Sequence, residues 1–202
     1  MKAIIFSGGS AHPLPPNLIQ PNDYIIAADG GYVFAKKNKI TPNITIGDFD
    51  SLEEHKIKGK TLKLSPKKDD TDTLSAAKYA LKMDCDEVII VGALGGRFDH
   101  AFANLQTLLH IKNAGAKAQI IAKDLRITLI KDEKIKIAKE FRYLSIYAVG
   151  GQAEGVTLKG VKYSLDNATL TPDFPVGTSN EIIEKSAEIE VKNGNLLIIE
   201  QD

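Results

Sequence analysis

Short apolar runs, each followed closely by glycine or aspartate, recur along the first 120 residues and alternate with segments of helical periodicity. The runs span residues 2–6, 24–28, 43–46 and 87–91, with a shorter one at 62–64. Continuous apolar runs of this length are typical of buried strands, and strands that alternate with helices form a mainly parallel sheet. The pattern therefore predicts an α/β domain, with helices on the faces of its sheet.

Helices are expected in three of the intervening segments. One follows Gly31, a second spans residues 72–83, and a third follows His100. The apolar stripe of the third comprises Phe102, Leu105, Leu108 and Leu109. Every strand of the predicted sheet thus ends in a loop that leads toward a helix or another strand, the position at which α/β proteins bind ligands.

After about residue 121 the sequence changes to short β-rich runs separated by turn signals, at 125–130, 134–137, 143–148, 154–158, 187–191 and 196–199. Asn193-Gly194, between the last two runs, predicts a type I′ hairpin. No helical pattern is evident, so this half predicts a small antiparallel β-sandwich. We expect an α/β domain over residues 1–122 and a C-terminal β-sandwich domain over residues 123–202.

Charge and cysteine content exclude several classes of protein. Lys plus Arg and Asp plus Glu both number 26, so no net field attracts nucleic acid or an anionic membrane. Cys85 is the single cysteine, which excludes an intramolecular disulfide and a cysteine-based metal site. No apolar run approaches 18 residues, and the N-terminus does not resemble a signal peptide. We expect a cytoplasmic protein with no nucleic-acid or membrane partner.

Two acidic clusters lie between residues 47 and 72. Asp48 and Asp50 follow a predicted strand, whereas Asp69 and Asp72 stand at the start of a predicted helix. Two carboxylates about 4 Å apart repel each other by roughly 1 kcal/mol in water and about 4 kcal/mol at an effective dielectric constant of 20. A cation is therefore expected, and Mg²⁺ suits hard oxygen ligands shared with phosphates. The alternatives are a solvated loop for the first cluster and a helix cap for the second.

Glycine-rich turns follow three of the predicted strands. Ser7-Gly8-Gly9-Ser10 could cradle phosphate, although no Walker signature follows it. Asp29-Gly30-Gly31 adds a carboxylate that could equally cap a helix. Gly95-Gly96-Arg97-Phe98-Asp99-His100 has the strongest phosphate-binding character, because bare amides, a helix N-terminus and a guanidinium coincide there. The alternatives are an Arg97–Asp99 ion pair and a capping role for His100.

One polar stretch of the second half stands out, Gly177-Thr178-Ser179-Asn180-Glu181. Such a stretch is usually a surface loop. Its hydroxyls and amide could equally donate hydrogen bonds to a heterocycle.

Taken in order, these motifs resemble those of the thiamine pyrophosphokinase family. The motifs that carry the resemblance are residues 29–31, 47–51, 69–72, 95–100 with Asn104, and 178–180. The order of an α/β domain and then a β domain matches as well, so the resemblance covers nearly the whole chain. It implies an enzyme that transfers the pyrophosphoryl group of ATP to the hydroxyl of thiamine, giving thiamine diphosphate and AMP. It implies that residues 1–122 form the catalytic domain, which binds ATP and Mg²⁺, and that residues 123–202 form the thiamine-binding domain. It also implies a homodimer with active sites at the subunit interface.

The resemblance assigns roles by motif. It implies that Asp48, Asp50, Asp69 and Asp72 hold Mg²⁺ and the phosphates, and that Arg97 takes part in catalysis. It places Asp29, Gly30, Gly31, Gly95, Gly96, Asp99, His100 and Asn104 on the ATP side. Ser179 and Asn180 resemble the thiamine contact. Some relatives have a tryptophan near thiamine, but this chain has none, which leaves Tyr163 or Phe174 as candidate stacking partners.

Two other functions remain open from the residues themselves. Asp48-x-Asp50-Ser51 after a strand also resembles phosphohydrolases with an aspartyl nucleophile, although that interpretation leaves the Gly95-Gly96-Arg97 turn and the β domain without a role. The second is a non-catalytic thiamine or nucleotide sensor on the same scaffold. The intact acidic set argues against it.

Overall fold

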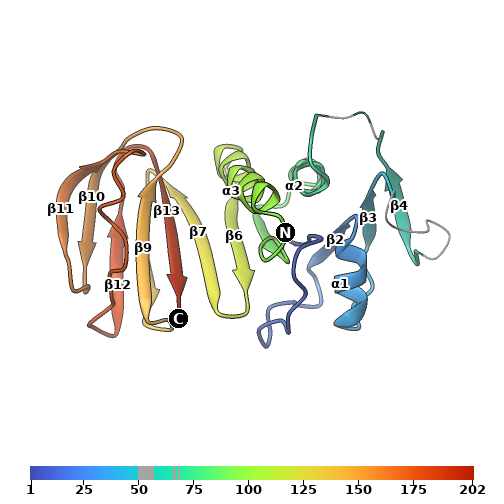
Figure 1. The fold of residues 1–202 in the computed structure, drawn as a ribbon, viewed down its shortest axis with the longest axis horizontal. Helices are drawn as coiled ribbons and strands as arrows, with labels where there is room; N and C mark the ends of the chain where they lie inside the picture. Colours follow the sequence, from blue (N-terminus) through green and yellow to red (C-terminus); the bar gives the residue numbers. More distant parts are fainter. Residues whose placement is uncertain (50–56, 66, 68) are drawn as a thin grey trace. The chain divides into compact units, whose positions relative to one another are not determined.

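The structure is a computed structural model that describes residues 1–49, 57–65, 67 and 69–202. The chain forms two compact units, Met1–Lys123 and Asp124–Asp202 (Figure 1). Each unit has its own apolar core. No helix among the described residues is long and apolar enough to cross a membrane.

The described part of the first unit contains a run of six neighbouring sheet strands that all lie parallel. Its order is β4 (Lys60–Lys63), β3 (Ile44–Gly47), β2 (Tyr24–Ala28), β1 (Lys2–Phe6), β5 (Glu87–Val91) and β6 (Lys117–Ala122). The central strands are buried at nearly every position. Because both faces are covered, these strands read as continuous apolar runs.

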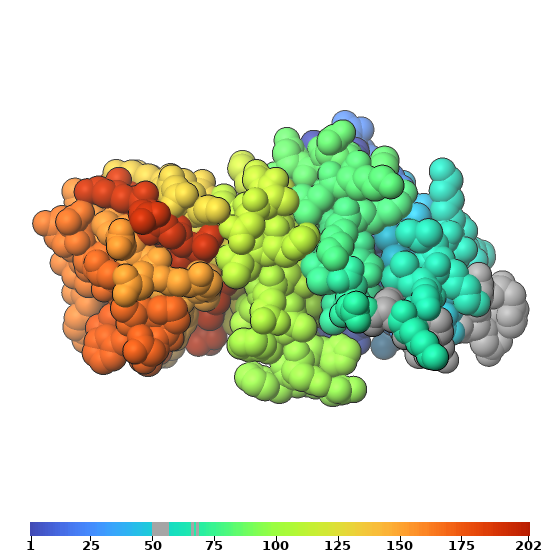
Figure 2. Space-filling model, turned by 90° about the horizontal axis from the view of Figure 1, so that it is seen from above, coloured from blue at the N-terminus to red at the C-terminus, as the bar shows by residue number. Residues whose placement is uncertain are grey.

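Helices cover both faces of this sheet. Phe34 of α1 (Gly31–Lys37) packs into a cluster with Phe6 and Ile25. The ring of Tyr79 in α2 (Asp72–Lys82) stacks on Tyr24, with 6.4 Å between centroids. Neighbouring strand residues point to opposite faces, so α1 and α2 lie on opposite sides of the sheet. Seen from above, α2 and α3 (Phe98–Asn113), in greens, form a continuous part of this unit's surface (Figure 2).

The strand order creates a switch point between β1 and β5. From β1 the chain adds β2 and β3 on one side, and later adds β5 and β6 on the other. The turns after β1 and β5 therefore start side by side at the same edge of the sheet, and the chain leaves them in opposite directions. Ligands of open α/β sheets bind in the crevice at such a point.

The second unit consists of two layers of antiparallel strands. One contains β7 (Leu125–Lys131), β13 (Asn195–Gln201) and β9 (Tyr143–Ala148). The other has the order β11 (Leu165–Leu170), β10 (Ala153–Lys159), β12 (Ser186–Glu190) and β8 (Lys134–Ala138). Leu144, Ile146 and Ile198 of the first sheet share a buried core with Val156 and Ile189 of the second. The predicted fold class, an α/β domain followed by an antiparallel β-sandwich, is confirmed.

The predicted hairpin at Asn193-Gly194 is wrong. β12 pairs with β8 and β10, whereas β13 pairs with β7 and β9, so the turn crosses from one sheet to the other. Asn193 forms an isolated bridge with Glu154, and the amide of Gly194 donates to Asp132 Oδ1 over 2.7 Å. These contacts fold the turn across the sandwich.

Three further features differ from the expectations. Strands β6 and β11 were not expected. Lys117–Ala122 has only two β-branched residues, and Leu165–Leu170 contains Asp166-Asn167, which favours a turn. Phe102 was expected on the buried stripe of α3 but is exposed. The buried face of that helix instead carries Asn104, Thr107, Leu108 and Ile111.

Candidate active site

A cleft of about 540 Å³ opens in the first unit. Four turns line it: those after β1, β2 and β5, and the turn that begins α2. The lining residues are Ser7, Gly8, Gly9, Ala28, Asp29, Gly30, Asp70, Thr71, Asp72, Thr73, Ala93, Gly96, Arg97, His100 and Asn104. The cleft thus lies where the strand order predicts a ligand site.

Backbone hydrogen bonds join the turn after β1 to the turn after β5. The amides of Ser7, Gly9 and Ser10 donate to carbonyl oxygens of segment 91–94 over 2.8, 2.8 and 3.0 Å. A Cβ on Gly9 would lie 2.3 Å from the carbonyl oxygen of Gly92, so no larger residue fits. The two turns therefore form one continuous wall of the cleft.

The turn after β2 is equally compact. Asp29 has a left-handed backbone, φ 43°, which a non-glycine residue adopts at some cost. A Cβ on Gly31 would lie 1.8 Å from the carbonyl oxygen of Phe6, so Gly31 lets α1 begin directly against β1. Asp29 and Gly30 line the cleft, while Gly31 acts through packing.

The first acidic cluster begins beside this turn. A Cβ on Gly47 would lie 3.0 Å from the Cβ of Asp29, so Gly47 brings the end of β3 close to Asp29. Asp48 follows directly and is half-buried. The prediction for Asp50 lies outside the described residues.

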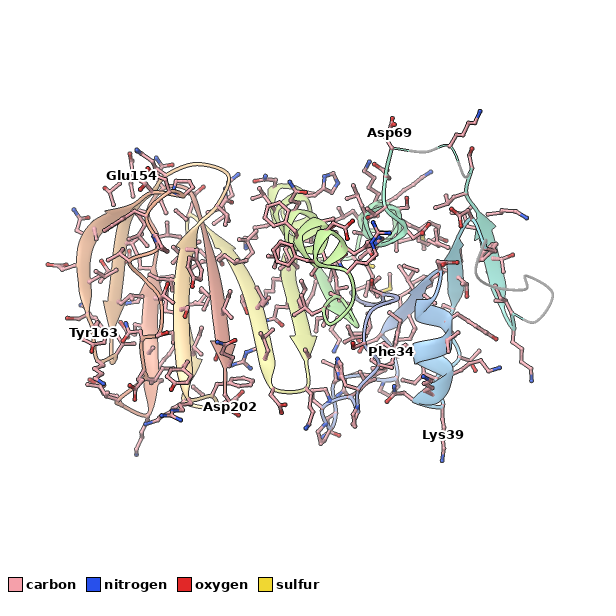
Figure 3. All side chains as sticks on the ribbon, viewed as in Figure 1. Phe34, Lys39, Asp69, Glu154, Tyr163 and Asp202 are labelled. Carbon is pink, nitrogen blue, oxygen red and sulfur yellow. The ribbon has the colours of Figure 1, made fainter. Side chains whose placement is uncertain are left out.

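The second acidic cluster leads into α2. Thr71 is the N-cap, since its Oγ1 accepts a hydrogen bond from the Leu74 amide over 3.2 Å. The helix-cap alternative therefore holds for Thr71. Asp72 lies in the first turn of the helix and lines the cleft. Asp70 Oδ2 pairs with Lys78 Nζ at 2.6 Å. Asp69 is exposed, and its side chain projects away from the sheet (Figure 3).

Arg97 and Asp99 form an ion pair in this structure. Arg97 Nε and Nη2 donate to Asp99 Oδ1 and Oδ2 over 3.1 and 2.5 Å. Hydrogen bonding from Arg97 lowers the pKa of the Asp99 carboxyl, and Asp99 raises the pKa of Arg97. Both side chains are largely exposed, so solvent screens the pair and Arg97 can exchange Asp99 for another anion.

Two other residues of this region support the turn after β5. Asn104 Nδ2 donates to the carbonyl oxygen of Ala93 over 2.8 Å, which fixes the turn to α3. Gly95 has a left-handed backbone, φ 79°, and its carbonyl accepts a hydrogen bond from the Ser10 hydroxyl. Gly96 and His100 line the cleft directly.

The arrangement suits an anion with several oxygens. Exposed glycine backbone, the N-terminus of α2 and the Arg97 guanidinium all favour negative charge. Across residues 1–49, 57–65, 67 and 69–202, no three Asp, Glu, His or Cys side chains gather closely enough to hold a metal ion. The four-carboxylate site includes Asp50 and therefore stays a prediction.

The polar residues singled out in the second unit have structural contacts. Asn180 is buried; its Oδ1 accepts from the amides of Tyr163 and Glu181 over 3.0 and 2.9 Å. Its Nδ2 donates to the Tyr163 carbonyl oxygen over 2.8 Å. Ser179 has a left-handed backbone, φ 59°, and its amide donates to Ser145 Oγ over 3.0 Å. These bonds hold the chain beside the exposed ring of Tyr163.

Sequence reasoning omitted Thr73 from the candidate site and gave little weight to the turn after β1. Ser7, Gly8, Gly9 and Thr73 all line the cleft. Ser-Gly-Gly after a buried strand was a usable signal. Thr73 carried none, because a threonine inside a predicted helix has no distinguishing pattern.

Known proteins resemble both units. Residues 15–120 match the family model described as thiamin pyrophosphokinase, catalytic domain, and residues 131–196 match its vitamin B1 binding domain. Thiamine pyrophosphokinase of Bacillus subtilis is 30% identical over 211 residues, covering 98% of each chain. Thiamin pyrophosphokinase 1 of Caenorhabditis elegans is 26% identical, covering 90% of this chain and 80% of the relative.

Solved structures agree with the sequence comparisons. The crystal structure of the B. subtilis thiamine pyrophosphokinase superposes with a TM-score of 0.89 at 28% identity, covering 100% of this chain and 99% of the other. Thiamin pyrophosphokinase from Candida albicans shares the fold, with a TM-score of 0.81 at 17% identity and 100% and 89% coverage. The chain belongs to the thiamin pyrophosphokinase family. These matches favour neither a phosphohydrolase nor a non-catalytic sensor.

Proposed function

We propose that this protein transfers the pyrophosphoryl group of ATP to the hydroxyl of thiamine, yielding thiamine diphosphate and AMP. The observation that carries the proposal is the cleft at the switch point, where glycine turns, a helix N-terminus and Arg97 surround a space with Asp29 and Asp72. Pyrophosphoryl transfer needs a triphosphate held in position and its charge stabilised, and little covalent chemistry. These groups are suited to that task.

The residues of the cleft would divide the work of binding ATP. Gly30 and Gly96 expose backbone that phosphate oxygens can approach closely. Arg97 would leave Asp99 and donate its planar fork to phosphoryl oxygens as negative charge develops on them. Asp99 then serves to orient Arg97, and Asn104 keeps the Ala93 carbonyl, and with it the turn, in position.

The carboxylates near the cleft fit Mg²⁺. Asp29 and Asp72 line it, and Asp48 follows the glycine that packs against Asp29. All are hard oxygen donors of the kind that Mg²⁺ prefers in sites shared with phosphates. We propose that Asp48 and Asp72, with Asp50, hold the ion, which when bound would neutralise phosphate charge. Asp69 would have to turn toward the cleft to join them, because its side chain projects away from the sheet.

We further propose a homodimer in which thiamine binds at the subunit interface. Phe98 in the first unit is 82% exposed, and Tyr163 and Phe174 in the second are 62% and 66% exposed. Contiguous exposed apolar patches mark contact surfaces, and these three side chains are available to form one between two copies of the chain. Ser179 would contact thiamine, Asn180 would hold the adjoining chain, and Tyr163 or Phe174 would stack on a thiamine ring. Sedimentation velocity at micromolar concentration tests the dimer, and a monomer would contradict it.

The activity is tested by incubating the purified protein with ATP, Mg²⁺ and thiamine and separating the nucleotides by chromatography. We expect AMP and thiamine diphosphate in equal amounts, both lost when thiamine or Mg²⁺ is omitted. Release of ADP or phosphate without thiamine would identify a hydrolase instead. Saturable binding without turnover would identify a sensor.

A further inference from the structure

Two hydroxyl groups from distant parts of the chain meet inside the cleft. Ser7 follows β1, and Thr73 lies in the first turn of α2. Ser7 Oγ and Thr73 Oγ1 are 2.8 Å apart, a hydrogen bond between residues 66 positions apart in the sequence. Each residue is only 6% exposed, and both line the cleft.

This pair has one hydroxyl proton more than its internal hydrogen bond uses. Two hydroxyls carry two protons, and the bond between them uses one. In the described part of the chain, neither hydroxyl has a second hydrogen-bond partner. Thr73 cannot donate to a helical carbonyl four positions back, because that position, Asp69, precedes the helix. Among the residues that the structure describes, the remaining proton has no acceptor, although buried hydroxyls normally have one.

Another buried threonine of the same unit shows the contrast. Thr107 in α3 is 2% exposed, and its hydroxyl donates to the Ala103 carbonyl oxygen over 2.9 Å. Its proton is fully used within the helix, as is usual for threonine there. The Ser7–Thr73 pair differs because it lines the cleft and has one hydroxyl proton that no described residue accepts.

The surroundings of the pair favour an anionic acceptor. Asp72 and Thr73 belong to the first turn of α2, whose free amides carry partial positive charge. On the other side, Gly8 lies between Ser7 and Gly9, whose amides are bonded to the turn after β5. The Gly8 amide makes no such bond within the described residues. A phosphoryl oxygen beside the pair would meet donors from both sides.

We propose that the Ser7–Thr73 hydroxyl pair donates a hydrogen bond, through its second hydroxyl proton, to a phosphoryl oxygen of the bound nucleotide. The pair also ties the start of α2, and so Asp72, to the glycine turns that surround the phosphates. The proposal rests on the proposed function, because it requires a nucleotide in this cleft. It assigns a nucleotide-binding role to two residues that the motif comparison leaves without one.

The test is calorimetric binding of α,β-methylene-ATP with Mg²⁺, since the methylene link blocks pyrophosphoryl transfer. Thr73→Val keeps the side-chain shape and removes the hydroxyl, so affinity should fall about tenfold or more, as for a lost hydrogen bond to a charged group. Thr73→Ser should bind within about threefold of the wild type. The KM for thiamine should stay unchanged in both variants, because the pair acts on the nucleotide.

Thr107→Val is the matched control. It removes an equally buried hydroxyl from the same unit, but outside the cleft lining, and should leave nucleotide affinity unchanged even if thermal stability falls. Ser7→Ala gives an independent measurement should Thr73→Val fold poorly, and it should weaken binding at least about threefold. The double variant should lose less than the product of the two single losses, because the hydroxyls act as a pair.

Three results would overturn the proposal. Wild-type affinity in both Thr73→Val and Ser7→Ala would show that the pair does not contact the nucleotide. A loss in Thr73→Ser equal to that in Thr73→Val would assign the effect to packing of the methyl group. If the wild-type protein neither bound the analogue nor formed AMP, the proposed function itself would be wrong. The first two results leave the proposed function intact, so the two kinds of failure can be told apart.

Discussion

The polar groups that the motifs single out make different contacts in the two units. In the first unit, Gly30, Gly96 and Arg97 present backbone and charge to an open cleft. In the second, the Asn180 side chain already makes three hydrogen bonds to the main chain of its own unit. A similar motif signal thus marks residues that line a cleft in one unit and a residue that supports the main chain in the other. The difference predicts which substitutions impair chemistry and which impair stability.

The largest expected effect belongs to Asp72 in the cleft. Asp72→Asn removes a charge without changing shape, and kcat/KM should fall at least about 10³-fold. The fold should persist, because the favourable interaction of a first-turn carboxylate with the helix dipole contributes only about 0.3–1 kcal/mol. Asp84→Asn, just beyond the C-terminal end of α2, is the control and should behave as wild type. Near-normal turnover in Asp72→Asn would contradict the assignment of the acidic residues.

Asn180 should give the opposite result. Asn180→Ala leaves two amides and one carbonyl near Tyr163 without partners, so unfolding free energy should fall by about 2–3 kcal/mol, or roughly 5–10 °C in Tm. Ser179→Ala should leave Tm unchanged and raise the KM for thiamine. Calorimetric melting and steady-state kinetics on both variants separate the two roles. An unaltered Tm in Asn180→Ala would show that Asn180 does not stabilise the second unit, and the contrast with the first unit would then be wrong.

Arg97 provides an intermediate case. Arg97→Ala should raise the KM for ATP or lower kcat by about tenfold to 100-fold in total, because a charge-assisted fork to phosphate is lost. The ion pair with Asp99 is exposed and contributes little to the free energy of unfolding, so Tm should not change. Arg142→Ala, an exposed cation of the second unit, is the control for charge alone. Equal kinetics in the two variants would exclude Arg97 from the site.

The smallest effect concerns the titration of Asp99. Its pKa is lowered by the hydrogen bond from Arg97, so the pair persists above the ordinary carboxyl pKa and breaks as pH falls through the lowered value. The pair should therefore contribute no pH dependence to activity near neutrality. Carboxyl NMR titration should show the Asp99 pKa rising in Arg97→Ala. An unchanged pKa would mean that the ion pair is absent in solution.

The sequence predicts the fold well wherever one physical signal dominates. The apolar runs at 2–6 and 87–91 correspond to β1 and β5 because a parallel strand is buried on both faces. Strand β11 was missed because Asp166-Asn167 reads locally as a turn, and pairing with β10 overrides that preference. Asn193-Gly194 does turn the chain, but sequence alone does not say whether the chain returns to the same sheet.

The candidate site was predicted at the level of turns rather than side chains. Glycine and aspartate after strands correctly indicated the edge of the sheet where the cleft lies. The partner of each side chain depends on residues distant in sequence, as for Asn104 with Ala93 and Ser7 with Thr73. No local pattern specifies such pairs.

The joining of the turns after β1 and β5 has a consequence for how the chain acquires its site during synthesis. Ser10 and Gly95, which share a hydrogen bond, are 85 positions apart. The first turn emerges from the ribosome long before its partner, and closing a loop of that length costs entropy that only later contacts recover. A nascent chain that ends before β5 should carry the β1 turn but no nucleotide site, so binding competence should arise late and in a single step.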